Sequence, residues 1–152
     1  MRWIVLFGLS LMLIGFSPEM SQANSSVRDL GAEAMNRINV ARAKKGRGPL
    51  RVSDKLTQAA ARHARDMAEK RYFSHTGSDG SEVGDRVNGE GYGYCLVAEN
   101  IAKGQGNLID AMRGWMNSRG HRRNILQKRA TEFGLVRGAD NIWVMVLGRP
   151  GC

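Results

Sequence analysis

The sequence contains little cysteine, fewer acidic than basic residues, and no apolar run long enough to cross a membrane. It has 2 cysteines, and 14 Asp and Glu stand against 23 Lys and Arg. The apolar run at residues 3–16 is shorter than the roughly 20 residues that a membrane-spanning helix needs. The contiguous HExxH pattern of zinc peptidases is absent, as are internal repeats. These absences argue against a repeat array and an HExxH peptidase.

The first 23 residues have the pattern of a secretory signal peptide. Arg2 supplies the positive start, residues 3–16 the apolar centre, and Ser21 and Ala23 the small residues before a peptidase cut. Cleavage after Ala23 would leave one domain, residues 24–152, in the periplasm or outside the cell. The alternative is a retained N-terminal anchor. No cysteine lies near the cut, which argues against a lipoprotein.

The excess of basic residues gives a net charge of +9, which favours anionic partners. Because export is predicted, we expect an anionic lipid or a cell-wall component rather than nucleic acid.

Both cysteines, Cys95 and Cys152, lie in the part expected to be exported. An oxidising compartment predicts a disulfide between them, which would attach the last residue to the middle of the domain. The alternative is a pair of free thiols, with Cys95 acting as a nucleophile beside a histidine.

Apolar residues at three- and four-residue spacing predict three helices. The first covers residues 27–45, the second starts at Ser53 or Asp54, and the third covers 107–118, with one further turn after Gly120. In the second helix, His63 falls on the apolar side. We therefore expect it to be a core histidine with one hydrogen bond.

The remaining segments predict loops and strands. Residues 75–106 hold eight glycines and are expected to form a long loop with a short helix at 82–88 and a short strand at 95–98. Residues 132–138 and 141–149 predict a β-hairpin. This order of elements predicts an α+β fold with a small, mostly antiparallel sheet.

Three segments, taken in order, resemble the bacterial branch of the CAP superfamily, which comprises the cysteine-rich secretory, antigen 5 and pathogenesis-related proteins. They are YFSHTGSDG (72–80), AENIAKG (98–104) and WMNSRGHRRNIL (115–126). The likeness extends from about Val27 to Gly148. It implies a three-layer α-β-α sandwich with a cleft of two histidines and two acids that holds a divalent metal.

Matched motif by motif, the resemblance implies that His75, Glu99 and His121 line this cleft. The second acid of the family lies three residues after the tryptophan of the helix, and this sequence has Ser118 there. Two imidazoles and one carboxylate can hold zinc, with a water as fourth ligand. A carboxylate from elsewhere would have to replace the missing acid, although no motif assigns one; the candidates are Asp79, Glu82 and Asp85.

Arg119, Arg122 and Arg123 surround His121 in the sequence. We expect them to form a basic rim that receives an anionic group at the cleft, the alternative being a solvated face. Nearby positive charge would lower the pKa of His121 and favour the neutral form that binds metal. The neighbouring Asn100 is expected to order its loop by binding backbone groups. Tyr92 and Tyr94 are expected to pack rather than to line the cleft.

Two functions of different kinds follow. The first is a non-enzymatic binding module for a lipid, cell-wall or other surface ligand, favoured by the charge, the predicted export and the incomplete acid pair. The second is a metal-dependent, peptidase-like hydrolase of the envelope, with Glu99 as ligand or general base. A third hypothesis uses Ser118 with His121, or Cys95 with His75, as nucleophile and base, but no orienting partner is identifiable. We rank the binding module first.

Overall fold

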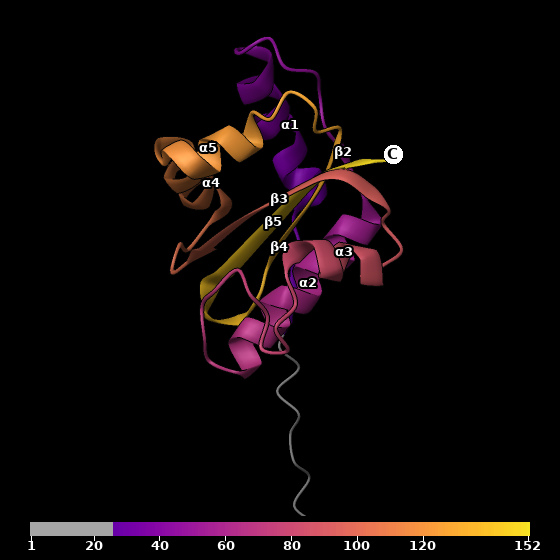
Figure 1. The fold of residues 1–152 in the computed structure, drawn as a ribbon. Helices are drawn as coiled ribbons and strands as arrows, with labels where there is room; N and C mark the ends of the chain where they lie inside the picture. Colours follow the sequence, from indigo (N-terminus) through magenta and orange to yellow (C-terminus); the bar gives the residue numbers. More distant parts are fainter. Residues whose placement is uncertain (1–25) are drawn as a thin grey trace, which may run out of the picture.

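The computed structural model describes residues 26–152 (Figure 1), so the predicted signal peptide lies outside the described residues. The elements follow one another in this order: β1 Arg28–Asp29, α1 Gly31–Ala43, β2 Arg51–Val52, α2 Asp54–Glu69, α3 Val83–Gly89, β3 Tyr94–Lys103, α4 Leu108–Asn117, α5 Arg119–Ile125, β4 Glu132–Arg137, the 3-10 turn η1 Ala139–Asn141, and β5 Ile142–Pro150.

The five strands form one mostly antiparallel sheet, as the sequence predicts. Its order is β1-β4-β5-β3, and the short β2 pairs in parallel with the other end of β4. β4 and β5 form the predicted hairpin around η1. Residues 142–148 of β5 are all buried. Unbroken burial along a strand means that both faces of the sheet are covered, which requires a three-layer arrangement.

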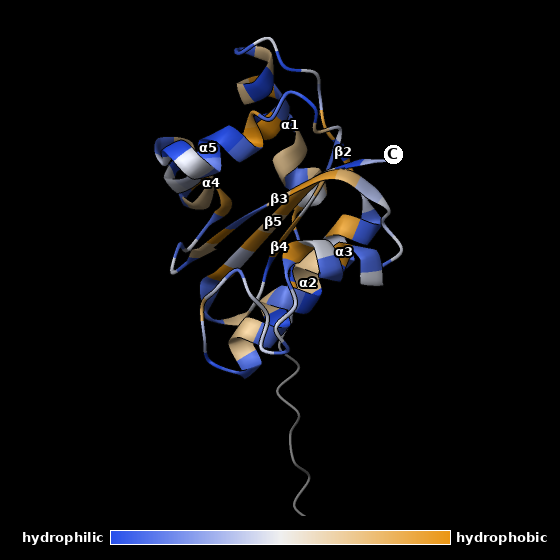
Figure 2. Cartoon of the chain, in the orientation of Figure 1, coloured by the Kyte–Doolittle hydropathy of each residue, from blue (hydrophilic) through white to orange (hydrophobic). Residues whose placement is uncertain are grey.

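The helices lie on both faces of the sheet, with α2 and α3 on one side and α1, α4 and α5 on the other (Figure 1). Apolar colouring is concentrated on the strands and on the helix sides that meet them (Figure 2). α2 packs close to β4 at Gly134, where a Cβ atom would collide with the backbone of α2. This arrangement confirms the α-β-α sandwich.

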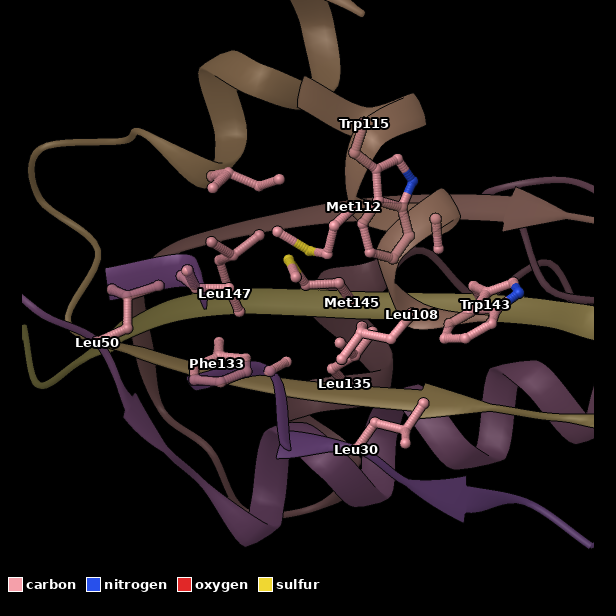
Figure 3. Close-up of a cluster of buried hydrophobic side chains, with 14 of the residues drawn as sticks. Leu30, Leu50, Leu108, Met112, Trp115, Phe133, Leu135, Trp143, Met145 and Leu147 are labelled. Atoms are coloured by element: carbon pink, nitrogen blue, oxygen red, sulfur yellow. The ribbon is translucent and has the colours of Figure 1, made fainter. Parts of the chain in front are cut away.

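Alternate residues of β4 and β5 point toward α1 and α4 and build the larger apolar cluster. Figure 3 shows Trp115 and Met112 of α4 beside Met145 and Leu147 of β5. Fully burying one such side chain contributes about 1.5–3 kcal/mol to stability. Trp115 also donates its indole N–H to the carbonyl of Ile101 at 3.2 Å, which fixes α4 against β3.

Several boundaries differ from the sequence predictions. α1 begins at Gly31 rather than near residue 27, because residues 28–29 pair with β4 and Asp29 accepts a hydrogen bond from the Gly31 N–H at 2.7 Å. β3 extends over ten residues, not four, because it pairs with β5 along its length. The segment after Gly120 belongs to a separate helix, α5, that begins at Arg119.

Cys95 and Cys152 are joined in a disulfide, with their Cα atoms 5.2 Å apart. The bond attaches the last residue to the start of β3, as the sequence predicts. The alternative of a free Cys95 nucleophile is therefore wrong. Among residues 26–152, no helix has the length and apolar character needed to cross a membrane.

Arg42 of α1 is fully buried and binds four backbone carbonyls instead of a carboxylate. It donates from Nε to Gly48 at 2.7 Å, from Nη1 to Ile125 at 2.7 Å and Gln127 at 3.0 Å, and from Nη2 to Ala130 at 3.2 Å. A buried guanidinium is tolerated only when its N–H groups are bonded. Arg42 therefore ties α1 to the segment that leaves α5.

Candidate functional site

Glu99 lies at the centre of a buried polar network on β3. Like its strand neighbours Val97 and Ile101, it faces α2 and α3, and it is 7% exposed. Its Oε1 lies 2.8 Å from Nδ1 of His75, and its Oε2 lies 2.9 Å from Nη2 of Arg86. Both carboxylate oxygens are therefore occupied by partners from this chain.

Arg86 of α3 holds the network together, although sequence reasoning missed it. Its side chain is 2% exposed and donates to the backbone carbonyls of Ser81 at 2.7 Å and His75 at 2.9 Å, as well as to Glu99. A buried ion pair needs such additional hydrogen bonds to offset desolvation. The sequence predicts the helix that carries Arg86, but no sequence pattern marks this arginine as buried.

His75 is the exposed member of the network, in the loop that follows α2. Half of its side chain is exposed, and its Nδ1 donates to Glu99, which leaves Nε2 available for a ligand or a proton. The hydrogen bond to Glu99 raises the pKa of His75, and burial opposes this effect only in part. A buried carboxylate thus orients an accessible imidazole.

His63 of α2 lies on the buried side of the same network. Its side chain is fully buried, and Nε2 lies 2.9 Å from the carbonyl oxygen of Ser74, so Nε2 carries the proton. This is the core histidine with one hydrogen bond that the sequence predicts. Nε2 is also 3.9 Å from Oε1 of Glu99, a proximity that the helix pattern did not indicate. Burial lowers the pKa of His63.

His121 belongs to α5. Burial lowers the pKa of His121, and the positive charge on protonated His75 lowers it further. α5 is held to β3 by side-chain amides. Asn100 donates to the His121 carbonyl at 3.1 Å, and Asn124 donates to the Asn100 side chain at 2.9 Å and the Glu99 carbonyl at 3.1 Å. Asn100 thus binds backbone, the role expected for it.

The three arginines near His121 have different surroundings. Arg119 and Arg123 are exposed, while Arg122 donates from Nη1 to the Met116 carbonyl at 2.8 Å and lies against α1. The pKa of His121 is lowered, as expected, but the causes are burial and the charge on His75 rather than these arginines. Ser118 joins α4 to α5, and its carbonyl accepts the Arg122 N–H at 2.9 Å.

The three candidate replacement acids belong to the loop and to the start of α3. Asp79 accepts a hydrogen bond from the Ser81 N–H at 2.9 Å. Glu82 accepts from the Thr76 hydroxyl at 2.8 Å, and Asp85 accepts from the Glu82 N–H at 2.9 Å. Each carboxylate therefore stabilises local backbone or loop structure.

The two tyrosines near β3 have different surroundings. Tyr92 is 4% exposed and donates to Glu132 at 2.9 Å, in agreement with the packing role. Tyr94 is 37% exposed and lies against Gly84 of α3.

The donor set does not fit the zinc ion that the resemblance implies. Among residues 26–152, no three His, Cys, Asp or Glu side chains are grouped closely enough to hold a metal. Catalytic zinc takes three protein ligands. His75 and His121 offer two imidazoles, but the third expected ligand, Glu99, is occupied by His75 and Arg86.

The family model of CAP, the cysteine-rich secretory protein family, matches residues 35–145. The chain belongs to the CAP family. This match confirms the resemblance carried by the three sequence segments, and it spans every element that supplies the network around Glu99.

Two bacterial proteins are similar to this chain, one in sequence and one in structure. The uncharacterized protein YkwD of Bacillus subtilis is 35% identical over 115 residues, which are 76% of this chain and 45% of that protein. An extracellular protein containing an SCP domain from Bacillus anthracis matches with a TM-score of 0.73 and 29% identity, over 78% of this chain and 39% of that chain. This CAP domain thus spans less than half the length of either relative.

An outer surface protein from Borrelia burgdorferi also has a TM-score of 0.73, over 84% of this chain and 99% of that one. At 22% identity, this likeness shows the fold alone.

Proposed function

We propose that this CAP domain is a secreted, non-enzymatic module that binds an anionic amphiphile, such as a lipid of the cell envelope. The observation that carries the proposal is a groove between α1 and α5 with an apolar floor and a basic rim. The structural relative from Bacillus anthracis is described as an extracellular protein, which supports the secreted location.

The groove has a volume of about 550 Å³ and combines two kinds of side chain. Its apolar part includes Val40, Met116 and Leu126, and Val40 is 47% exposed. Covering such surface is favourable in proportion to its area. Its basic part consists of Arg37, Lys44, Lys45 and Arg122. Cationic groups beside an apolar floor suit a ligand with an acyl chain and a phosphate or carboxylate head.

The walls of this groove are fixed before any ligand arrives. Arg42 joins α1 to the end of α5 through the carbonyl of Ile125, and Arg122 is held by the carbonyl of Met116. Because the groove is preformed, ligand binding costs less conformational entropy in the protein. The side chain of Glu99 lies on the other face of the sheet, toward α2 and α3.

Co-sedimentation with vesicles tests the proposal. We expect the protein to bind vesicles with anionic lipids more strongly than neutral ones, and added salt to weaken the charge-dependent part. Lys44→Glu places an acid on the groove rim and is expected to weaken binding about tenfold. Lys70→Glu is the matched control, because it changes the net charge equally at the exposed end of α2.

An equal loss in both lysine variants would mean that only the net charge acts, and this would contradict a groove site. Equal binding to neutral and anionic vesicles would contradict the role of the basic rim.

A hydrolase is the second candidate, favoured by one observation. His75 is oriented through Nδ1 by the buried Glu99 and keeps Nε2 accessible, an arrangement typical of a general acid or base. This candidate requires an activity on envelope peptides that His75→Ala abolishes. If a metal takes part, a calorimetric zinc titration must show one-to-one binding that is lost in both His75→Ala and His121→Ala.

A further inference from the structure

Two segments of the chain contain basic residues and no acidic ones. Residues 34–53 and 111–131 each hold six Lys and Arg, while the rest of residues 26–152 holds ten Lys and Arg against thirteen Asp and Glu. The positive charge of the domain is therefore concentrated in these two segments, and the remainder is slightly acidic. Such an uneven distribution favours an anionic partner at the basic segments.

The fold brings the two segments together through Arg42. The guanidinium of Arg42 binds the carbonyl of Gly48 at 2.7 Å in the first segment. It also binds the carbonyls of Gln127 at 3.0 Å and Ala130 at 3.2 Å in the second segment. The chain after α1 and the chain after α5 therefore lie side by side (Figure 1).

Five cations surround this contact, and we call them the basic end: Lys44, Lys45, Arg47, Lys128 and Arg129. Arg47 is half-buried and the other four are exposed. Within residues 26–152, none of the five has an acidic partner within 4.0 Å. Burial lowers the pKa of Arg42, and the charge of Arg47 lowers it further. Because unpaired like charges repel one another, a polyanion would relieve repulsion at this end of the domain.

The arrangement of the charges restricts the partner. The five cations come from two segments, so a polymer with an anion in every unit can contact more of them than one small anion can. Guanidinium groups bind phosphate oxygens in pairs, which suits a phosphodiester. The basic segments hold one Phe, Trp or Tyr, Trp115, and it is 1% exposed. Single-stranded nucleic acids bind by stacking on exposed aromatic rings, so these segments favour a polymer without bases.

We propose that the basic end binds a flexible phosphodiester polymer, of the kind that a cell wall can contain. A chain of small units can bend from one segment to the other, whereas a chain of sugar rings is stiffer. Lys44 and Lys45 also belong to the rim of the amphiphile groove, but Arg47, Lys128 and Arg129 do not line it. The polymer needs no acyl chain, so either proposal can fail alone.

Calorimetric titration of the protein with poly(glycerol phosphate) at several salt concentrations tests this proposal. The slope of log affinity against log salt measures how many phosphates the protein neutralises. Lys128→Gln/Arg129→Gln removes two contacts and is expected to reduce that slope by about 1.5. Lys70→Gln/Arg71→Gln is the matched control, because it removes the same pair of residues, exposed at the end of α2 and without an ion pair among residues 26–152.

We expect the control to keep the slope of the unchanged protein, and comparable unfolding midpoints would show that folding is not the cause. An equal reduction in both variants would overturn the proposal, because net charge alone would then act. Glycerol phosphate that binds as tightly as the polymer, per phosphate, would overturn it in favour of a single-anion site. Tighter binding of polygalacturonate or of duplex DNA, at equal charge, would overturn it in favour of those polymers. No binding of poly(glycerol phosphate) would also overturn it.

Discussion

The two faces of the sheet each bury one arginine, and the two arginines are used differently. Arg42, on the face covered by α1, α4 and α5, binds four backbone carbonyls. Arg86, on the face covered by α2 and α3, binds two carbonyls and the carboxylate of Glu99. The first arrangement joins segments of chain, while the second also positions an ionisable group that orients His75.

The two faces of the sheet therefore differ in composition: one is packed with apolar residues, and the other buries ionisable residues. The face with Arg42 has a continuous apolar cluster and carries a groove whose walls are locked together. The face with Arg86 has polar residues buried beneath it, including His63 and Glu99, next to a polar hollow. The amphiphile groove lies on the first of these two faces.

The largest expected effect comes from Arg42→Met, which leaves buried carbonyls such as those of Ile125 and Ala130 without a donor. We expect a loss of about 4 kcal/mol in the free energy of unfolding, measured by urea denaturation. Arg28→Met is the control, since the Arg28–Glu33 pair is exposed and contributes at most about 1 kcal/mol. Equal losses of unfolding free energy in the two variants would contradict the structural role assigned to Arg42.

Arg86→Met is expected to cost about 3 kcal/mol, because it leaves the buried carboxylate of Glu99 without its guanidinium. Adding Glu99→Gln should recover part of this loss, since the double variant buries no unpaired charge. A double-mutant cycle in urea measures the coupling energy. Strictly additive effects would mean that the buried pair does not act as a unit.

The smallest effect is expected on the titration of His75, followed by nuclear magnetic resonance. Glu99→Gln removes the negative partner of Nδ1, so the pKa of His75 should fall toward about 6.5, its value in an unfolded chain. An unchanged pKa would contradict the hydrogen bond to Glu99.

The raised pKa of His75 also makes the stability of the fold depend on pH. Because folding raises the pKa of His75, its contribution is fully present below a pH of about 6.5 and is lost as pH rises through the folded value. The stability difference between the protein and His75→Gln should therefore shrink over that rise. Burial lowers the pKa values of His63 and His121, and their contributions act in the opposite direction, being lost as pH falls.

The sequence predicted those elements of the fold that depend on local patterns of apolar and polar residues. α2 shows a clear apolar stripe, and α3 falls within one residue of its expected bounds at each end. β3 was underestimated because its buried polar residues, Glu99 and Asn100, interrupt the apolar signal, and only pairing with β5 defines its length. β1 and β2 have two residues each and exist only through their pairing with β4.

The sequence predicted only part of the candidate site. The motifs identified His75, Glu99 and His121, but they gave no sign that Arg86 occupies the second oxygen of Glu99. That contact joins α3 to β3 through tertiary packing. The sequence also suggested one basic cleft near His121, whereas Arg122 turns toward α1 and lines a separate groove. The direction of a side chain on a helix as short as α5 depends on the elements that pack against the helix. The residues adjacent in sequence do not show which elements these are.

The most direct test of the proposed function is a calorimetric titration with a single-chain anionic amphiphile, comparing Val40→Asp with His75→Ala. Val40 lies in the groove and is 47% exposed, so the substitution places a charge on the apolar floor without disturbing the core. The account predicts that Val40→Asp abolishes binding and that His75→Ala retains it. Binding that survives Val40→Asp and is lost in His75→Ala would contradict the account and place the ligand at the histidines.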